Sequence, residues 1–334
     1  MNFALIGAAG YVAPKHMKAI HQTGHQLVAA VDKHDSVGII DSYFPNAAFF
    51  TEMERFDRHI DRMYRGKHAD AVDYVSICSP NYLHDAHCRL ALRSGAHAIC
   101  EKPLVINPWN VDQLRELEEE TGQKVYNVLQ LRLHPAVVAL KQAAEAEQAA
   151  RREAVATADA PAKKEISLTY VTRRGNWYLR SWKGDAAKSG GVAMNIGVHF
   201  FDFLLWVYGG VKRSYVHLSE PTRMSGSLEL DDAHVRWFLS VDESDLPEAT
   251  REAGQYAFRS ITVDGEEIDL SAGFTDLHTV VYQDILDGGG FGLTAAQPAI
   301  ELIHQIRNSS PVAAYGSDAH PFIEAGNVRL KRAA

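Results

Sequence analysis

The sequence has few cysteines, no excess of positive charge and no apolar run long enough to cross a membrane. The three cysteines among its 334 residues, Cys78, Cys88 and Cys100, are odd in number and widely spaced, which argues against a disulfide framework and favours a reducing cytoplasm. A formal net charge of −8 argues against broad binding to nucleic acids or anionic membranes. The most apolar stretch, residues 198–211, is interrupted by polar side chains and is shorter than the roughly 20 residues that a membrane helix needs. We therefore expect a cytoplasmic protein without nucleic-acid or membrane partners.

The first 128 residues alternate short apolar runs with amphipathic segments. The runs predict five strands, at residues 3–6, 27–31, 74–78, 96–100 and 125–128. Helical periodicity between them is clearest over residues 84–93 and 111–120. Such alternation indicates a mostly parallel, doubly wound α/β sheet. We predict a dinucleotide-binding Rossmann domain over residues 1–128.

After residue 165 the pattern changes to longer strands with alternating apolar and polar residues. These are expected at residues 166–171, 227–230 and 233–241, followed by a hairpin around Asp264-Gly265 and a closing helix over residues 295–308. The pattern predicts a second, α+β domain over residues 129–334, with a largely antiparallel sheet and helices on one face, that binds substrate and forms oligomers. Residues 141–165 lack a large apolar stripe, so we expect a variable helical excursion or linker there.

A glycine-containing turn follows the first predicted strand. In Gly7-Ala8-Ala9-Gly10-Tyr11-Val12-Ala13 the glycines let backbone amides approach a pyrophosphate, and the start of a helix favours its negative charge. Glycine also marks many ordinary strand–helix turns. Asp32 strengthens the cofactor interpretation, because an acidic residue after the second strand holds the adenosine ribose hydroxyls and repels a 2′-phosphate. Gly7, Gly10, Tyr11, Val12 and Asp32 are therefore the predicted binding residues for NAD rather than NADP.

Small polar side chains follow the next predicted strand. Ser79 and Asn81 come at the carboxyl edge of the sheet, where ligands bind in this architecture, and suit the nicotinamide-side ribose. We add His84 to this cofactor set. His84, His87 and Cys88 are also of metal-binding types, but they share one helix flank with no fourth ligand evident. We therefore predict no metal site.

A lysine and a histidine supply what the oxidation of an alcohol requires. Lys102 lies in the turn Glu101-Lys102-Pro103, and His199 follows Asn195 by four residues, on one face of a predicted helix. A neutral imidazole can take the hydroxyl proton near pH 7, and an ammonium stabilises the charge that develops on the oxygen. Lys102 is an alternative base. Asp202 either orients His199 or makes an ordinary helix-side hydrogen bond.

The Glu-Lys-Pro turn, together with Gly190-Gly191…Gly197-x-His199-x-x-Asp202, resembles the glucose–fructose oxidoreductase and inositol dehydrogenase family over nearly the whole chain. The resemblance implies that Lys102 is catalytic, that its bond to Pro103 is cis, as it often is in the family, and that His199 is an acid or base on a sugar hydroxyl. Many members have an aspartate where this chain has Asn195. An amide cannot take a proton, so the substitution favours His199 as the base.

Residues 173–188 are basic within an acidic chain and are interleaved with aromatic residues. Arg173, Arg180 and Lys183 can bind a diphosphate or a carboxylate, and Trp182 can stack on a base, a sugar or the nicotinamide. The other interpretation is a strand that leads into a solvated loop.

The run Arg174-Gly175-Asn176-Trp177-Tyr178…Ser181-Trp182-Lys183-Gly184, with Gly273-Phe274-Thr275-Asp276-Leu277-His278-Thr279, is similar to UDP-N-acetylglucosaminuronate 3-dehydrogenases of bacterial lipopolysaccharide and O-antigen sugar pathways. The resemblance implies NAD-dependent oxidation of this UDP-sugar at C3. It also implies homotetramers joined through the second-domain sheet and, in some members, reoxidation of NADH by 2-oxoglutarate. The residues it assigns are Lys102, Asn195 and His199 at the reacting carbon, Glu101, Lys102, Gln130 and Trp182 on the cofactor, and Arg173, Arg180, Lys183 and His278 on the substrate.

Two other functions remain open. An inositol or simple sugar dehydrogenase of the same family would not need the basic and aromatic run. A non-catalytic, NAD-binding regulator would need neither Lys102 nor His199.

Overall fold

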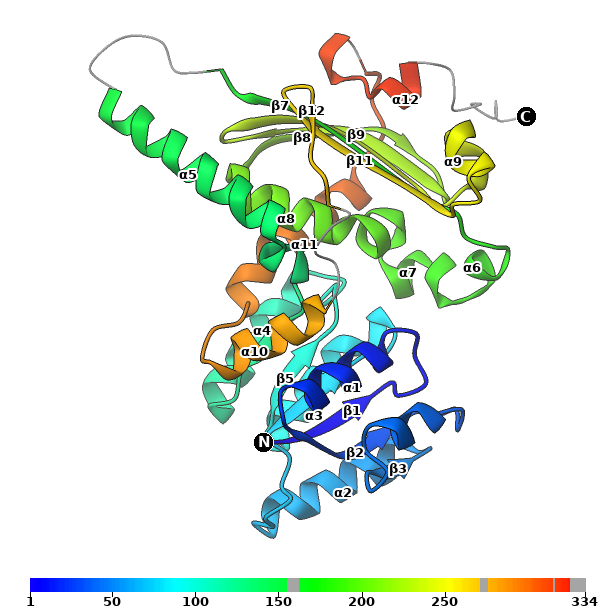
Figure 1. Cartoon of the computed structure of the whole chain (residues 1–334), viewed down its shortest axis with the longest axis vertical. Coiled ribbons are helices and arrows are strands. Elements are labelled where there is room, and N and C mark those ends of the chain that lie inside the picture. The colour runs from blue at the N-terminus through cyan, green and yellow to red at the C-terminus, as the bar shows by residue number, and fades with distance from the viewer. Residues whose placement is uncertain (155–161, 271–275, 315, 325–334) are drawn as a thin grey trace. The chain divides into compact units, whose positions relative to one another are not determined.

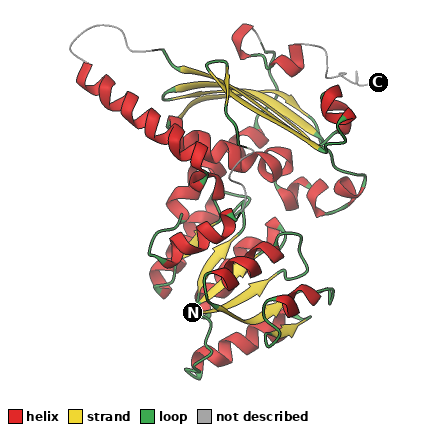
Figure 2. Ribbon diagram, viewed as in Figure 1, coloured by secondary structure: helices red, strands yellow, loops and turns green. Residues whose placement is uncertain are grey.

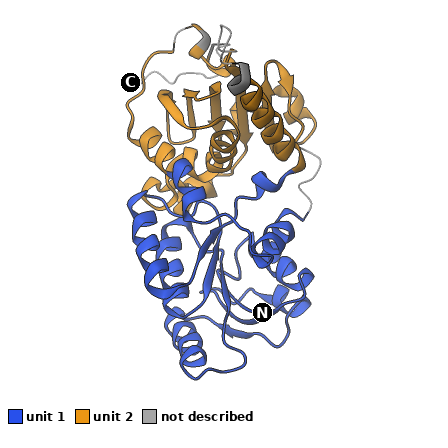
Figure 3. Ribbon diagram, turned by 90° about the vertical axis from the view of Figure 1, so that its left-hand side faces the viewer, with its two compact units in different colours: residues 1–134, 273–300 blue, residues 135–272, 301–334 orange. Residues whose placement is uncertain are grey.

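The structure is a computed structural model of the chain and describes residues 1–154, 162–270, 276–314 and 316–324 (Figure 1). The chain forms two compact units (Figure 3). Residues 1–134 and 273–300 make up the first, and residues 135–272 and 301–334 make up the second. A six-stranded sheet runs through each unit.

The first unit is a parallel sheet with the strand order β3-β2-β1-β4-β5-β6. Its strands are β1 (Asn2–Ile6), β2 (Gln26–Val31), β3 (Ala48–Phe50), β4 (Tyr74–Ile77), β5 (His97–Cys100) and β6 (Val125–Asn127). The helices between them are α1 (Ala13–Gln22), α2 (Met53–Arg65), α3 (His84–Arg93) and α4 (Trp109–Thr121). The predicted doubly wound fold is confirmed. Because the order reverses between β1 and β4, the turns after these strands diverge at the carboxyl edge, where such folds bind ligands.

Both faces of this sheet are apolar. Successive residues of a strand point to opposite faces, and in β1 Phe3 and Leu5 join the core cluster that includes α1. Their neighbours Ala4 and Ile6 join the cluster that includes α2, α3 and α4. Burial on both faces explains why these strands are continuous apolar runs in the sequence.

The segment 273–300 packs with the first unit. It contains α10 (Leu277–Leu286) and the start of α11 (Leu293–Asn308). Val281, Tyr282 and Ile285 of α10 lie in the same core cluster as α1. The sequence interpretation placed this segment in the second domain, since a helical pattern identifies an amphipathic helix without identifying its packing partner.

The second unit has the strand order β12-β11-β7-β10-β9-β8. Figure 2 shows the strands of both sheets in yellow and the helices in red. Its strands are β7 (Lys164–Thr172), β8 (Val211–Ser219), β9 (Arg223–Leu230), β10 (Ala233–Ser240), β11 (Ala257–Val263) and β12 (Glu266–Glu267). Its helices are α5 (Pro135–Ala154), α6 (Trp177–Arg180), α7 (Ala186–Ser189), α8 (Val198–Tyr208), α9 (Glu248–Glu252) and α12 (Pro321–Glu324). Among the described strands of this second sheet, β7 and β10 are the one pair that runs parallel, so the predicted, largely antiparallel sheet is confirmed.

Helices cover more than the one face of this sheet that the sequence suggested. Trp237 of β10 contacts Phe201 of α8, with ring centroids 5.3 Å apart. Its neighbour Phe238 points to the other face and contacts Phe322 of α12 at 5.2 Å. Short additional turns are η1 (Gly38–Ser42), η2 (Asn81–Leu83), η3 (Gln130–Leu133), η4 (Trp182–Gly184), the π-helical η5 (Ala193–Gly197), η6 (Glu243–Asp245) and η7 (Gly316–Asp318).

The expected excursion at residues 141–165 is largely helix α5, which packs against α8; residues 155–161 lie outside the described residues. The expected hairpin is present as β11 and β12, joined at Asp264 and Gly265, whose φ angles of 52° and 87° are both positive. Type I′ hairpin turns require positive φ at both central residues.

One helical stretch, Ala186–Tyr208, is long and apolar enough to cross a membrane by length and composition alone. Of its most apolar window, 72% is buried within the protein. That degree of burial is typical of a core helix, and we interpret the stretch in this way.

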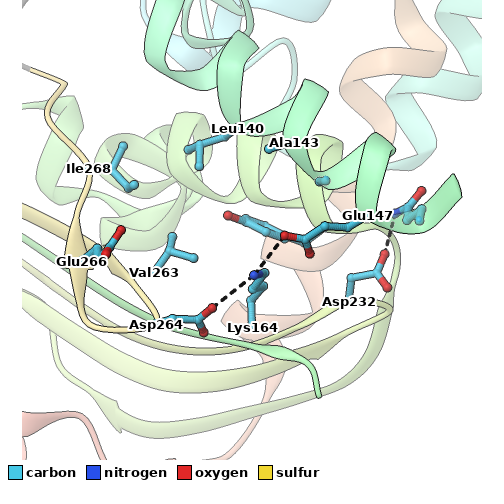
Figure 4. A pocket seen from close by; sticks show the side chains of 12 residues that line it. Leu140, Ala143, Glu147, Lys164, Asp232, Val263, Asp264, Glu266 and Ile268 are labelled. Atoms are coloured by element: carbon cyan, nitrogen blue, oxygen red, sulfur yellow. Dashed lines mark hydrogen bonds and ion pairs between the residues drawn. The ribbon is translucent and has the colours of Figure 1, made fainter. Parts of the chain in front are cut away.

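Between α5 and the β11–β12 hairpin lies a cavity of about 370 Å³ (Figure 4). Leu140, Val263 and Ile268 contribute apolar side chains to its wall. Lys164 forms ion pairs with Glu147 and Asp264 there. The lining includes none of the predicted site residues.

Candidate active site

The turn after β1 is shaped for close approach of the backbone. Gly7 has a φ angle of 90°, and a Cβ atom at this position would lie 2.8 Å from the carbonyl carbon of Cys78. Glycine is therefore the residue that fits. Gly10 N–H donates to the Gly7 carbonyl at 3.0 Å, and α1 begins three residues later at Ala13. Tyr11 is fully exposed and Val12 is half-buried. The amides at the start of α1 suit a pyrophosphate, so this turn fits a dinucleotide.

Asp32 lies directly after β2 and beside the glycine turn. Its Oδ2 accepts a hydrogen bond from the Ala9 N–H at 3.0 Å, and its Oδ1 accepts one from the His34 N–H at 2.9 Å. These two bonds fix the carboxylate next to the turn. This is the position in which an acidic side chain holds ribose hydroxyls in such folds.

Ser79, Asn81 and His84 follow β4 and are all buried. Ser79 Oγ lies 2.8 Å from His87 Nδ1, and burial lowers the pKa of His87 to about 4, so this imidazole is neutral at physiological pH. His84 has a different role from its neighbours. Its Nε2 lies 2.8 Å from the Ser79 carbonyl oxygen and its Nδ1 lies 2.7 Å from the Pro103 carbonyl oxygen, so it bridges the turns after β4 and β5.

Glu101, directly after β5, is surrounded by hydrogen-bond donors. Its Oε1 lies 3.1 Å from His16 Nε2 and 3.0 Å from His278 Nε2, and its Oε2 accepts the Lys102 N–H at 3.1 Å. Burial by itself would raise the pKa of Glu101, but the hydrogen bonds from the two histidines outweigh it and hold this pKa well below its usual value. Glu101 is therefore an ionised carboxylate inside the first unit.

Two further predicted residues complete the carboxyl edge. The Lys102–Pro103 peptide bond is cis, which confirms that implication of the family resemblance. Gln130, in η3 after β6, has a buried Oε1 that no donor among the described residues reaches. A buried acceptor of this kind requires a partner, and the carboxamide of a bound nicotinamide carries the matching N–H groups. The glycine turn and Gln130 are both features that fit NAD.

Asn195 and His199 lie at the junction of η5 and α8 in the second unit. Both are half-buried, and Asn195 Nδ2 donates to the hydroxyl of Tyr178 at 2.6 Å. The His199 ring packs against Phe200, with centroids 4.2 Å apart. The sequence predicted an ordinary α-helix here, whereas residues 193–197 are π-helical. Such turns occur frequently at functional sites.

The basic and aromatic run forms α6, η4 and α7 after β7. Arg173 Nη1 forms an ion pair with Glu243 at 2.8 Å. The Lys183 Nζ lies 4.2 Å from the ring centroid of Trp182, a favourable cation–π arrangement. Arg180 is exposed. These residues lie in one segment of the second unit, as the sequence predicted, and their contacts with a substrate stay predictions.

The structure groups the predicted site residues by unit. The first unit contains the glycine turn, Asp32, Ser79, Asn81, His84, Glu101, Lys102, Gln130 and His278. The second unit contains Arg173, Arg180, Trp182, Lys183, Asn195 and His199. That Lys102 and His199 act on one carbon stays a prediction. The sequence assigned His278 to the substrate. In the structure the Nε2 of His278 is hydrogen-bonded to Glu101 Oε1, so a substrate would have to contact the Nδ1 of this ring.

Sequence reasoning missed His16 and its partner Tyr282. His16 Nδ1 lies 2.7 Å from the Tyr282 hydroxyl, and the His16 side chain is fully buried. One signal was available, because His16 shares the apolar face of α1 with Ala13, Met17 and Ile20. A polar residue on such a face requires a partner.

Comparison with known proteins then identifies the family. A model of an oxidoreductase family with an NAD-binding Rossmann fold (GFO/IDH/MocA) matches residues 1–128, and the model of its C-terminal alpha/beta domain matches residues 160–243. The chain belongs to this family. This match to the GFO/IDH/MocA oxidoreductases confirms the resemblance inferred from the Glu-Lys-Pro and histidine motifs.

Solved structures within the family include nearly full-length relatives. The WlbA (WbpB) dehydrogenase from Thermus thermophilus, in complex with NAD and UDP-GlcNAcA, is 47% identical over 96% of this chain and 99% of its own, with a TM-score of 0.88. A second structure of that dehydrogenase, with NAD and alpha-ketoglutarate, is 48% identical over the same shares, with a TM-score of 0.87. D-glucoside 3-dehydrogenase from Escherichia coli (strain K12) is 28% identical over 212 residues, which are 63% of this chain and 54% of that relative. The match thus spans about half the length of that curated relative.

Proposed function

We propose that the protein oxidises the C3 hydroxyl of UDP-N-acetylglucosaminuronic acid to a ketone, with NAD as the hydride acceptor. The observation that carries this proposal is the 47% identity, over nearly both whole chains, to a dehydrogenase whose structure contains NAD and UDP-GlcNAcA. The glycine turn and the position of Asp32 support it, because the turn lets backbone amides approach a diphosphate and a carboxylate beside it favours NAD over NADP.

In this proposal the first unit holds the cofactor. Amides of the glycine turn and the start of α1 bind the diphosphate, and Asp32 binds the adenosine ribose. Ser79, Asn81 and Gln130 contact the nicotinamide end, with Trp182 of the second unit as an additional contact. Bound NAD supplies the nicotinamide C4 that accepts the hydride.

Three residues act on the sugar. His199 takes the proton of the C3 hydroxyl, and the Lys102 ammonium stabilises the negative charge that develops on the oxygen. Asn195 hydrogen-bonds a sugar hydroxyl and is oriented by Tyr178. Lys102 as the base is the alternative assignment, and the His199 prediction in the Discussion distinguishes the two.

The basic run supplies cations for the substrate's anions. Arg180 and Lys183 are the first candidates for the diphosphate and the carboxylate. Arg173 is bound to Glu243, so it would have to exchange that partner for the substrate. Charge reversal at Arg180 and Lys183 that leaves substrate affinity unchanged would overturn this assignment.

The cellular setting is also part of the proposal. We infer a cytoplasmic homotetramer, joined through the second-unit sheet, that supplies a 3-keto sugar nucleotide to lipopolysaccharide O-antigen synthesis. The alpha-ketoglutarate in a relative's structure supports 2-oxoglutarate as the oxidant that regenerates NAD in place. The cysteines support a reducing compartment, since all three are free and buried.

Product analysis tests the function. Purified protein is incubated with NAD and UDP-N-acetylglucosaminuronic acid, with and without 2-oxoglutarate, while NADH fluorescence and the mass of the sugar nucleotide are followed. We expect a product lighter by two hydrogens and, with 2-oxoglutarate, 2-hydroxyglutarate. Turnover of myo-inositol alone would replace the substrate but keep the mechanism. Tight NADH binding without any product would favour a regulator.

A further inference from the structure

A buried network of side chains lies beneath the lysine turn of the first unit. Glu101 is held by His16 of α1 and His278 of α10, two helices that are far apart in the sequence and packed together in the fold. His16 continues to Tyr282, whose hydroxyl lies 2.5 Å from Ser76 Oγ. His16, Ser76 and Tyr282 are fully buried, and Glu101 and His278 nearly so.

The hydrogen atoms of this network have one consistent arrangement. An ionised carboxylate only accepts hydrogen bonds, so both histidines present an Nε2–H to Glu101 Oε1. His16 Nδ1 then lacks a proton and accepts the hydroxyl of Tyr282, whose oxygen accepts the hydroxyl of Ser76. Burial lowers the pKa of His16, which keeps its ring neutral as this arrangement requires. The hydrogen bonds therefore all donate in one direction, from Ser76 to Tyr282, from Tyr282 to His16 and from His16 to Glu101.

This arrangement leaves Glu101 little capacity for a ligand. One oxygen accepts two imidazole N–H groups, and the other accepts the Lys102 N–H. His16, Glu101 and His278 are also side chains of the types that bind zinc. A metal ion among them would have to displace both Nε2 protons, whereas the hydrogen-bonded arrangement already satisfies the carboxylate and both nitrogens of His16.

The network extends to the backbone of Lys102, the residue next to Glu101. Glu101 Oε2 binds the backbone N–H of Lys102, so the carboxylate fixes the backbone from which the lysine side chain extends. On the other side of Lys102, the Pro103 carbonyl is held by His84 of α3. Three helices thus hold the turn, and one of them, α1, begins at the glycine turn of the cofactor site.

We propose that His16 and His278 are positioning residues that act through Glu101 to hold Lys102 at the reacting carbon. The role rests on the proposed function, in which the Lys102 ammonium stabilises charge on the substrate oxygen. It replaces the direct cofactor contact predicted for Glu101 and the direct substrate contact predicted for His278. A misplacement of about 1 Å in such a group can lower the rate about 100-fold.

The test compares His278→Leu, which removes the donor, with His278→Gln, whose amide N–H reaches the place of Nε2–H. In His278→Leu we expect kcat to fall about 100-fold, while the NADH dissociation constant and the KM for the UDP-sugar change little. His278→Gln should recover most of kcat. His97→Leu is the matched control, because it removes a histidine that accepts one hydrogen bond at the opposite end of β5 and should leave kcat unchanged.

Hydrogen exchange gives a measurement that does not depend on turnover. The Lys102 amide is protected by Glu101 Oε2, so its deuterium uptake, taken as the difference between overlapping peptides that end at Glu101 and at Lys102, reports on this bond. Uptake should rise in His278→Leu and in the nearly isosteric Glu101→Gln, which also serves if His278→Leu does not fold. If wild-type protein oxidises no sugar nucleotide, the proposed function fails while this measurement still tests the network.

Three results would overturn the proposal. The first is unchanged Lys102 exchange in folded His278→Leu and Glu101→Gln. The second is a loss of NADH affinity that parallels the loss of kcat, which would make Glu101 a cofactor contact. The third is one equivalent of zinc retained by the wild-type protein and lost in His16→Leu.

Discussion

Gly7 makes the cofactor turn dependent on a single residue. Its positive φ angle disfavours any side chain, and its backbone lies against the carbonyl group of Cys78. Gly24 has a similar φ of 78° but no atom within 4 Å of its would-be Cβ. The pair therefore separates the effect of backbone conformation from that of a steric clash.

We predict that Gly7→Ala lowers the stability of the protein by about 1–3 kcal/mol and strongly weakens NADH binding, because the turn must move away from Cys78. Gly24→Ala should show only a backbone effect of about 1–2 kcal/mol and unchanged NADH affinity. Urea unfolding and NADH fluorescence titration measure both quantities. Equal NADH affinity in the two variants would contradict the steric argument.

His199 decides the assignment of the base. We predict that His199→Asn lowers kcat by a factor of about 100 or more, because an amide cannot take a proton, and leaves the NADH dissociation constant unchanged. Steady-state kinetics with the UDP-sugar measure this effect. His234→Asn is the control, because His234 lies on β10, where it pairs with Glu165 of β7. Full activity in His199→Asn together with an inactive Lys102→Ala would make Lys102 the base.

The residues of the site differ in how far the sequence reveals them. Gly7 and Lys102 lie in sequence motifs that indicate their function before the fold is known. His16 and Tyr282 stand in no such motif, and their bond joins positions 266 residues apart. Contacts of that separation depend on tertiary packing, which one sequence does not encode in a readable pattern. The sequence also could not distinguish Glu101 as an anchor from Glu101 as a ligand.

At the scale of elements, α10 illustrates how a helix is tied to a sheet that lies far away in the sequence. Its buried residues pack on α1, and the Tyr282 hydroxyl contacts both His16 and Ser76. Removal of that hydroxyl leaves two buried polar groups with one partner fewer. An unsatisfied buried group typically costs about 1–3 kcal/mol.

We therefore predict that Tyr282→Phe lowers the free energy of unfolding by about 1–3 kcal/mol, measured as a shift of the urea midpoint. Tyr126→Phe on β6 is the matched control, because the Tyr126 hydroxyl has no hydrogen bond among the described contacts, and its midpoint should barely move. If both variants were equally stable, the hydroxyl of Tyr282 would contribute nothing to the docking of α10.

Predictability of elements follows their length and regularity. Strands with continuous apolar runs, such as β1 and β4, and helix α3 were predicted within a residue or two. Strand β3 was missed because it has only three residues, all half-buried. Strand β8 was missed because its exposed residues include Lys212, Arg213 and Tyr215, so its pattern resembles a polar loop.

At the scale of the whole molecule, the sequence revealed two domains but not how the chain is divided between them. Residues 273–300 pack with the first unit, and their pattern is that of any amphipathic helix.

Burial of histidines gives the whole molecule a pH dependence that no single motif shows. Histidines in both units are buried in a neutral form, among them His87 in the first and His320 in the second.

Buried neutral histidines make stability depend on pH. Burial, assisted by the nearby positive charge of Arg236, lowers the pKa of His320 to about 3. Its ring also faces the hydroxyls of Ser167 and Thr169 and the rings of Phe238 and Phe322, and its Nδ1 accepts the Phe322 N–H at 3.2 Å. In the unfolded chain a histidine titrates near 6.5. Between these values the unfolded state binds a proton that the folded state does not, so stability falls as the pH falls below about 6.5.

Glu101 contributes in the same direction but at lower pH. Its pKa is depressed in the folded state, so its contribution is complete above the unfolded value of about 4.3 and is lost below it. We predict that the free energy of unfolding declines between pH 6.5 and 5, above the range in which the contribution of Glu101 is lost. His320→Gln should flatten that decline by up to about 1.4 kcal/mol per pH unit. Urea unfolding of both proteins at pH 7, 6 and 5 measures the difference. Parallel curves would mean that His320 accepts a proton in the folded protein, and that its surroundings are more polar than its burial indicates.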